Sequence, residues 1–337
     1  MSVPAVRPRR TFPGIAPVTW EHPADRAALQ ALRSVPGMDD VVRKVIAFLG
    51  GERGIRLLFQ GNAIRVGPTQ LPRLHTLHVE VCTTFDWPTV PELYVSQTPF
   101  FNAGAYGVDD PFIVLNSSAL ELLDDDELRA LLAHEMGHVM SGHALYRTIA
   151  AILATVSLSA LPFLAGVALL PVRLAFLEWS RKSELSSDRA ALLGAQDVVA
   201  TQRLFMKMAG GSRGQFAAGE LNPDAFMAQA NEYLGANAGL DVLYKVINTL
   251  GLSHPMHTVR AAELQQWVVA GEYDRVLRGE YPRRGAEQAA RPVGEDMKAG
   301  AEHYRREARD LAEQVTKAAR EAAERVGDAF RQAAQKG

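Results

Sequence analysis

The spacing of apolar and polar positions predicts helices over the first part of the chain. Residues 25–32 and 38–48 carry apolar side chains three and four positions apart, and two glycines follow the second segment. Pro72 opens a further helical pattern, whereas residues 55–66 fit a helix or a strand equally well. Helices are therefore expected at residues 25–32, at 38–48 and from Pro72 onward.

Between residues 93 and 116 the pattern changes to short apolar runs. Residues 93–95, 101–107 and 111–116 are three strand candidates, and Asp109-Asp110 marks a turn between the last two. A strongly helical segment follows at once, so we expect a small antiparallel sheet beside that helix. An exposed edge strand in such a sheet could hold an extended peptide by strand addition. Asn102 and its small neighbours form either this strand or a plain loop.

The next segment has the clearest helical pattern in the chain. Asp124 can cap a helix, and Glu127, three residues later, completes a capping box. Leu128, Leu131 and Leu132 then follow at helical spacing and give the helix an apolar side. A helix that buries this side is expected from residue 125 onward.

This helix carries the candidate chemistry, because residues 134–138 read His-Glu-x-x-His. His134 and His138 lie four residues apart on one face, so both imidazoles can reach a single ion. Glu135 points about 100° round the helix and can face the open position of the metal without being a ligand. Zinc lowers the pKa of its bound water toward neutrality, and Glu135 can take the proton, which is the chemistry of metal-assisted peptide hydrolysis. Two surface histidines on an amphipathic helix would give the same pattern, and the bare pattern leaves both interpretations open.

A second acidic pair lies downstream and favours the metal site. Glu184 and Asp188 are four residues apart, hence on one helix face. Glu184 can supply a third, carboxylate ligand, and Asp188 is then placed to accept the outer N–H of a metal-bound histidine. The alternative is a solvated acidic pair flanked by basic residues. After a His-Glu-x-x-His helix, the metal-site interpretation is the better one.

Two further histidines are weaker candidates. His143 lies five residues after His138, about 140° further round the helix, and is interpreted as structural rather than as a ligand. His257 has no partner that the sequence identifies, and we expect it to face solvent.

Residues 148–172 carry no charged side chain and form the one candidate membrane segment. A single span needs about 20 apolar residues, but it would place Glu184 across the bilayer from the two histidines, and two spans would need about 40 residues. Pro162 and Gly166 also interrupt the run. We therefore expect an apolar helical hairpin over 145–178 that is buried or dips shallowly into a membrane.

The two ends of the chain differ in composition from the rest. Residues 1–17 are basic and proline-rich, which predicts a disordered tail, and no apolar run follows that would indicate a secretory signal. Residues 18–283 are expected to form the catalytic domain. Residues 284–337 read as a linker and an alanine-rich amphipathic helix, which could pack on the core, pair with another helix, lie on a membrane surface, or remain solvated.

Composition narrows the setting of the protein. The chain has 337 residues and a formal net charge of −2 at pH 7, which gives no indication of nucleic-acid binding. Cys82 is the only cysteine, so no internal disulfide can form. A cytoplasmic location is the default expectation, with residues 148–172 and the C-terminal helix as candidates for peripheral membrane contact. The oligomeric state is not indicated.

Taken together, these motifs resemble the HtpX-type and CAAX-prenyl-protease-type zinc metallopeptidases, metallopeptidase family forty-eight in the gluzincin group. The resemblance spans roughly residues 66–264, in the family's order. The motifs that carry it are Phe101-Asn102-Ala103-Gly104, the helix of residues 128–143, Glu184-x-x-x-Asp188, and Ser253-His254-Pro255 followed by Arg260.

The resemblance implies an α+β, predominantly helical, zincin-like fold and one zinc ion per chain. It implies His134, His138 and Glu184 as the metal ligands and Glu135 as the catalytic base. It further implies that substrate lies along the edge strand at Asn102, Ala103 and Gly104. His254 and Arg260 are expected at the cleft as catalytic residues, either assisting the oxyanion or holding Asp and Glu side chains.

The expected function is therefore that of a zinc-dependent endopeptidase acting on protein or peptide substrates. The alternative is a non-catalytic, zinc-stabilised scaffold, or a membrane-associated protein that binds peptides. A purely structural zinc site normally has four protein ligands, and the presence of Glu135 in the motif weighs against that alternative.

Overall fold

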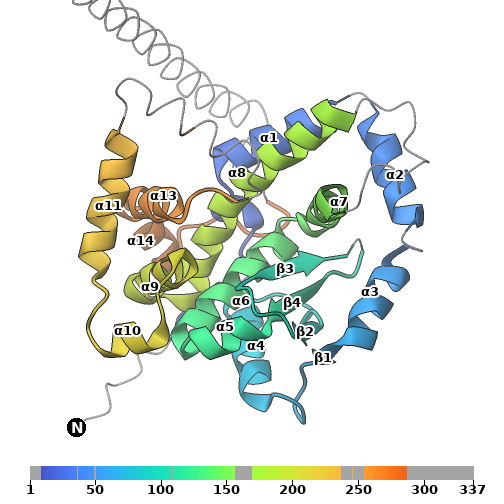
Figure 1. The fold of residues 1–337 in the computed structure, drawn as a ribbon. Helices are drawn as coiled ribbons and strands as arrows, with labels where there is room; N and C mark the ends of the chain where they lie inside the picture. Colours follow the sequence, from blue (N-terminus) through green and yellow to red (C-terminus); the bar gives the residue numbers. More distant parts are fainter. Residues whose placement is uncertain are drawn as a thin grey trace, which may run out of the picture.

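The computed structural model describes residues 9–35, 37–48, 51–107, 109–155, 169–236, 245 and 254–286. The fold is α+β and predominantly helical, as predicted. Helix α6, Asp125–Met140, and helix α8, Leu169–Ala195, pack against each other at the centre of the molecule (Figure 1). The sheet lies on one side of α6 and the C-terminal helices on the other, so α6 and α8 form the frame on which any site must be built.

The four strands are β1, Ala63–Arg65; β2, Leu93–Ser96; β3, Ala103–Tyr106; and β4, Phe112–Asn116. Their order in the sheet is β1-β2-β4-β3, and β2 pairs with β4 in parallel. The prediction of a purely antiparallel sheet is therefore wrong for this pair. Strands β2 and β4 are almost wholly buried and therefore lie side by side at the centre of the sheet. The partly exposed β3 lies at its edge.

The ambiguous segment at residues 55–66 contains both kinds of structure. Helix α3, Gly51–Asn62, leads directly into strand β1, which pairs antiparallel with β2. The remaining α-helices in the described ranges are α1, Pro23–Arg33; α2, Met38–Phe48; α4, Pro72–Thr84; α5, Ser117–Leu122; α7, Ala144–Thr155; α9, Val198–Ala209; α10, Arg213–Ala217; α11, Pro223–Gly235; α13, His257–Val269; and α14, Glu272–Leu277.

Helix α6 begins as predicted, with a capping box. The Asp124 carboxylate accepts from the backbone N–H groups of Asp126 and Glu127, and the Glu127 carboxylate accepts from the backbone N–H of Asp124 at 2.8 Å. These bonds satisfy N–H groups that a helix start leaves without intrahelical partners. Every residue of α6 from Glu127 to Met140 is buried, so most of the helix is held in place by the core.

Two glycines allow α6 and α8 to approach closely. A Cβ added to Gly137 of α6 would lie 2.7 Å from the Cβ of Ala190, and one added to Gly194 of α8 would overlap Ala133. Any larger residue at these positions would push the two helices apart. The close packing therefore brings the acidic pair on α8 next to the histidines on α6.

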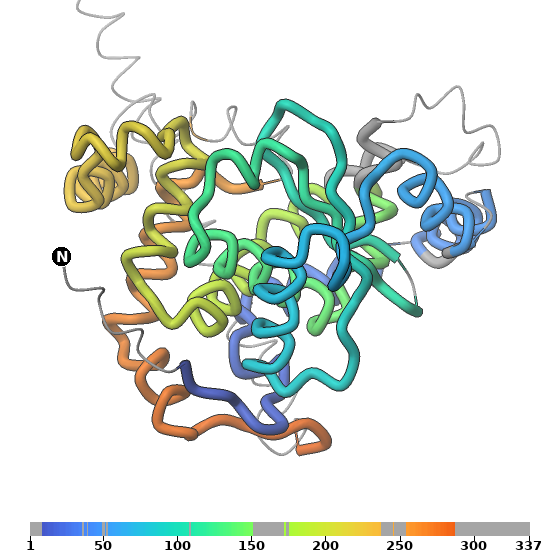
Figure 2. The backbone as a smooth tube through the Cα atoms, turned by 90° about the horizontal axis from the view of Figure 1, so that it is seen from below, coloured from blue at the N-terminus to red at the C-terminus, as the bar shows by residue number. Residues whose placement is uncertain are grey.

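Residues 9–17 are packed on the core, so the prediction of a disordered tail is wrong for this part. Phe12 and Ile15 are 1 % and 0 % exposed, and Ile15 forms an antiparallel bridge with Arg283. Figure 2 shows the dark blue N-terminal segment running beside the orange segment that ends the described chain. Composition predicted disorder because prolines and arginines dominate, yet the buried side chains of Phe12 and Ile15 and the hydrogen bonds of Arg9 and Arg10 hold this segment on the domain. The same contact keeps residues up to 286 on the domain.

Two predicted features lie wholly or partly outside the described residues. Helices α7 and α8 contact each other and flank residues 156–168, where the apolar centre of the predicted hairpin falls. The predicted C-terminal amphipathic helix falls within residues 287–337. Among the helices that the structure describes, none combines the length and apolar character needed to cross a membrane.

Candidate metal centre

Side chains from α6 and α8 converge on one buried point. His134, His138 and Glu184 each contribute one ligand-type atom, and these atoms lie within 4.8 Å of one another. The two histidine Nε2 atoms are 3.2 Å apart. Oε2 of Glu184 lies 3.3 Å from Nε2 of His134, and Oε1 lies 3.3 Å from Nε2 of His138. Within the described ranges, this is the one cluster of such residues that could hold a metal ion.

This donor set fits a zinc ion. Two imidazole nitrogens and one carboxylate are the protein ligands of a catalytic zinc site that keeps a further position for water or substrate. The three residues that the sequence predicted as ligands are therefore the three that the fold brings together.

The outer nitrogen of His134 is held by a carboxylate that is itself fixed. Nδ1 of His134 lies 3.1 Å from Oδ1 of Asp188. Arg260 from α13 donates two hydrogen bonds to that carboxylate, at 2.8 and 2.5 Å. A carboxylate on Nδ1 keeps the proton there, which leaves Nε2 free to bind a metal. This is the place that the sequence predicted for Asp188.

The charges around the cluster shift its pKa values strongly. Burial alone would lower the pKa of His134, but the carboxylates of Glu184 and Asp188 outweigh it and raise that pKa to about 9. Burial would raise the pKa of Glu184, yet His254, Arg147 and Arg260 hold it well below its usual value. Glu184 is thus ionised at neutral pH, as a metal ligand must be.

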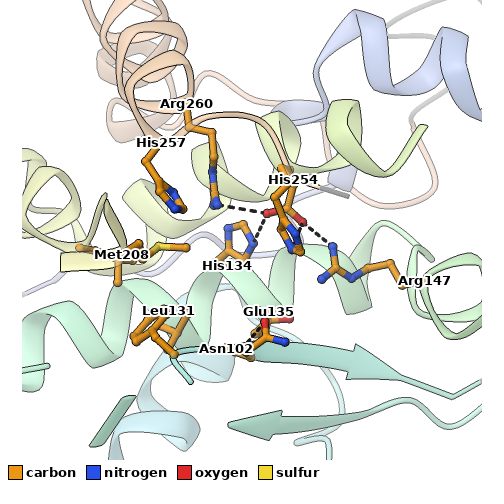
Figure 3. Close-up of a pocket in the computed structure, with 13 residues that line it drawn as sticks. Asn102, Leu131, His134, Glu135, Arg147, Met208, His254, His257 and Arg260 are labelled. Carbon is orange, nitrogen blue, oxygen red and sulfur yellow. Dashed lines mark hydrogen bonds and ion pairs between the residues drawn. The ribbon is translucent and has the colours of Figure 1, made fainter. Parts of the chain in front are cut away.

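Glu135 lies at the wall of a cavity of about 200 Å³ in front of the cluster (Figure 3). It is 2 % exposed, and its Oε2 has no hydrogen-bond partner among the described residues. Burial raises the pKa of Glu135, although His134 and Arg147 oppose the shift. A carboxylate whose pKa is moved toward neutrality can both accept and return a proton, which is what general acid–base catalysis requires.

Sequence reasoning missed two residues that line this cavity. Arg147 from α7 forms an ion pair with Oε1 of Glu184. It lies at the border of the apolar block, where a single charge gives no signal of a site. His257, expected to face solvent, also lines the cavity, and in the structure as described its buried Nδ1 has no hydrogen-bond partner. The prediction for His257 is therefore wrong, because the start of α13 turns toward the cleft rather than away from it.

Of the other predicted residues, Arg260, His254, Asn102 and Ala103 line the cavity, and Gly104 does not. Arg260 is 1 % exposed, and its Nη1 lies 3.4 Å from Oε2 of Glu184, so it holds the Asp and Glu carboxylates. His254 is partly exposed, with Nε2 3.6 Å from Oε1 of Glu184. Asn102 and Ala103 line the cavity at the start of the edge strand β3, whereas Gly104 lies further along that strand and outside the lining.

Residues 68–268 match the model of Peptidase family M48, which is more than half of the chain. The chain belongs to peptidase family M48. The predicted relationship and fold type are thereby confirmed. The members of this metallopeptidase family depend on a metal, and the His134, His138 and Glu184 cluster of this M48 peptidase lies within the matched region.

Individual relatives agree with this assignment. The chain is 36 % identical over 264 residues to the plastoglobule-localized metallopeptidase 48, chloroplastic, of Arabidopsis thaliana, covering 77 % of this chain and 75 % of that protein. It is 38 % identical over 69 residues to a protease HtpX homolog of Helicobacter pylori, which covers 20 % of this chain and 22 % of the homolog. A match to the protease HtpX homolog of Kineococcus radiotolerans is 35 % identical over 100 residues and covers 29 % and 34 %. No solved structure matches this M48 peptidase significantly.

Proposed function

We propose that this M48 metallopeptidase is a zinc-dependent endopeptidase that hydrolyses peptide bonds in protein substrates. The observation that carries the proposal is the position of Glu135. Its buried carboxylate, with one oxygen that no described residue hydrogen-bonds, lies on the wall of the same cavity as His134 and Glu184. A site that served only to stabilise the fold would need neither such an acid nor a cavity in front of it.

The roles of the residues follow from their places. His134, His138 and Glu184 would hold one zinc ion per chain. When bound, zinc supplies Lewis-acid polarisation of the scissile carbonyl and of a water molecule. Glu135 accepts a proton from that water and returns it to the leaving amine, and its raised pKa suits both transfers. His254, partly exposed at the cavity, is the candidate for stabilising the oxyanion.

The edge strand β3 supports an extended mode of substrate binding. Among the described strands, β3 is hydrogen-bonded to β4 alone, and its first residue, Ala103, lines the cavity together with the preceding Asn102. A peptide added beside β3 would continue the sheet and lead its backbone past Glu135. Main-chain pairing of this kind would accept a range of substrate sequences.

The substitution Glu135→Gln tests the catalytic role, because it keeps the shape of the side chain and removes the base. We expect a loss of about 10²–10⁴-fold in casein hydrolysis, the usual contribution of general acid–base catalysis. The zinc content, measured by atomic spectroscopy, should stay at that of the parent. Glu121→Gln, on an exposed acid of α5, is the control and should keep both. A Glu135→Gln protein that cleaves casein at the parental rate would refute the mechanism.

Metal content tests the ligands separately from catalysis. His134→Ala, His138→Ala and Glu184→Ala should each remove bound zinc, since each deletes one of only three protein ligands. If the parent binds zinc but cleaves no protein substrate, and a chelator changes only its stability, the scaffold alternative is correct. Retention of full zinc content in any of the three variants would exclude that residue as a ligand.

A further inference from the structure

A chain of buried polar side chains leads from His138 to the N-terminal helix α1. Nδ1 of His138 lies 3.1 Å from Nδ1 of His143, and Nε2 of His143 lies 3.1 Å from Oδ2 of Asp25. The hydroxyl of Ser186 on α8 donates to the same Oδ2 at 2.6 Å, and the backbone N–H of His22 donates to that hydroxyl at 2.8 Å. His138, His143, Asp25 and Ser186 are each no more than 2 % exposed.

The positions of the protons in this chain follow from the hydrogen bonds. Two Nδ1 atoms that face each other must divide the roles of donor and acceptor. If Nε2 of His138 is to bind a metal, its lone pair must be free, and the proton of that ring must be on Nδ1. Nδ1 of His143 then accepts, so the proton of His143 is on Nε2. That proton is donated to Asp25, whose carboxylate oxygen can accept from both His143 and Ser186.

We propose that His143 and Asp25 are positioning residues that hold His138 in the tautomer and orientation that bind metal. They would do for His138 what Asp188 and Arg260 do for His134. The inference rests on the proposed zinc site but not on the proposed hydrolysis. Asp25 lies outside the region that matches the family model, so the first helix of this chain completes a site built on α6 and α8.

A purely structural role would explain less of the geometry. The ring of His143 packs edge-on against Trp179, with ring centroids 5.5 Å apart, and an apolar ring could do the same. Packing requires neither a nitrogen aimed at His138 nor a carboxylate on the opposite nitrogen. The two roles differ in a measurable way, because packing affects folding whereas positioning affects the affinity for metal in the folded protein.

The test compares two substitutions of His143 in the full chain. His143→Phe keeps an aromatic ring and removes the acceptor, and we expect it to weaken zinc binding about 10–100-fold, the usual effect of losing such a partner. His143→Gln has a side-chain carbonyl that can accept from His138, and it should recover most of that affinity. Zinc affinity is measured by competition with a chromophoric chelator, and the visible spectrum of bound Co²⁺ reports the ligand geometry. The unfolding of each metal-free variant is measured in parallel.

Variants at Asp25 and on α8 supply the controls. Asp25→Asn keeps the size of the side chain and should weaken zinc binding about tenfold, near the lower end of that range. Ser186→Ala, which removes a donor to Asp25, should have a smaller effect in the same direction. Ser187→Ala is the matched control, because Ser187 is equally buried and its hydroxyl has no hydrogen-bond partner in the residues described. It should leave zinc affinity unchanged.

Zinc affinity within twofold of the parent in folded His143→Phe would overturn the proposal. If that variant does not fold, parental affinity in folded Asp25→Asn would overturn it equally. These outcomes do not depend on proteolysis. If the parent binds zinc but cleaves no protein substrate, the proposed function fails while the positioning proposal is still decided by the affinities. If the parent binds no zinc, both proposals fail.

Discussion

The two ends of helix α6 both bury charged side chains, but these side chains differ in how completely they are hydrogen-bonded. At the N-terminal end, Glu127 is 0 % exposed and Lys207 is 4 % exposed, and their ion pair measures 2.5 Å. Arg203 donates to both Glu127 and Asp124, and the backbone N–H groups of the capping box supply further donors. All four carboxylate oxygens of Asp124 and Glu127 accept a hydrogen bond.

At the C-terminal end of the same helix the bonding is incomplete. Two histidine nitrogens and a carboxylate point at one another, and Oε2 of Glu135 accepts no hydrogen bond from any residue described. Buried polar atoms without partners are rare because they cost free energy, so their presence in a native fold calls for an explanation. This difference between the carboxylates of Asp124 and Glu127 and that of Glu135 supports the proposal that the first cluster stabilises α6, whereas the second binds metal and takes part in catalysis. Matched substitutions at the two ends can test this division.

The largest effect on stability is expected from Glu127→Gln. The change leaves the ammonium of Lys207 buried without its counter-charge, and breaking a buried pair in this way costs about 3–5 kcal/mol. The free energy of unfolding, measured in urea on the metal-free protein, should fall by that amount. Zinc content and casein hydrolysis per folded molecule should be unchanged. A loss below about 1 kcal/mol would mean that water hydrates the Lys207 ammonium in the variant. The ion pair would then contribute less to stability than its burial indicates.

A smaller net loss is expected when both partners of the pair are changed. Glu127→Gln combined with Lys207→Met removes the uncompensated ammonium, and neutral replacement of both members of a buried pair is often well tolerated. The double variant should lose about 1–2 kcal/mol, mainly the bond from Arg203 to Glu127. Double-mutant analysis of the urea transitions gives the coupling directly. If the double variant loses the sum of the two single losses, the residues are not energetically coupled.

Residues close in sequence made much of the site predictable. His134 and His138, and likewise Glu184 and Asp188, share a helix face because they are four residues apart, and that period holds in any helix. The capping box at Asp124 is equally local. The sequence therefore indicated which side chains face one way on each helix. That α8 lies against α6 depends on Gly137 and Gly194, whose importance appears only when the two helices are packed together.

Residues distant in sequence could not be placed by the same reasoning. Asp25 reaches His143 from the first helix, and Lys207 reaches Glu127 from α9, and no spacing rule connects such positions. The parallel pairing of β2 with β4 has the same origin, because strand order depends on which strands the whole core buries. The error at residues 9–17 came from composition, which counts prolines and arginines but cannot show that Phe12 is buried in the hydrophobic core.

The substitution Asp124→Ala should have a still smaller effect. It removes the oxygen that accepts from the N–H groups of Asp126 and Glu127, and losing such a cap costs about 1 kcal/mol. The loss should appear in urea unfolding, with zinc affinity unchanged because the cap lies at the far end of α6 from the cluster. Weaker zinc binding in this variant would show that the two ends of the helix are coupled and do not have separate roles.

The smallest effect on stability is expected from Glu135→Gln, the variant with the largest expected effect on hydrolysis. Burial raises the pKa of Glu135 above its ordinary value of 4.5, so the folded metal-free protein is disfavoured by ionisation of this group. Gln carries no charge, and the variant should therefore match the parent or exceed it by up to about 1 kcal/mol at neutral pH. The direction of the pKa shift sets the pH range. Any gain in stability of Glu135→Gln over the parent is present above the raised pKa of Glu135. It disappears as the pH falls below 4.5, where Glu135 is protonated in both the folded and the unfolded parent. Urea unfolding of the two metal-free proteins across this range measures it. If Glu135→Gln instead loses as much stability as Glu127→Gln, Glu135 stabilises the fold as Glu127 does. The proposed difference between the two ends of α6 would then be wrong.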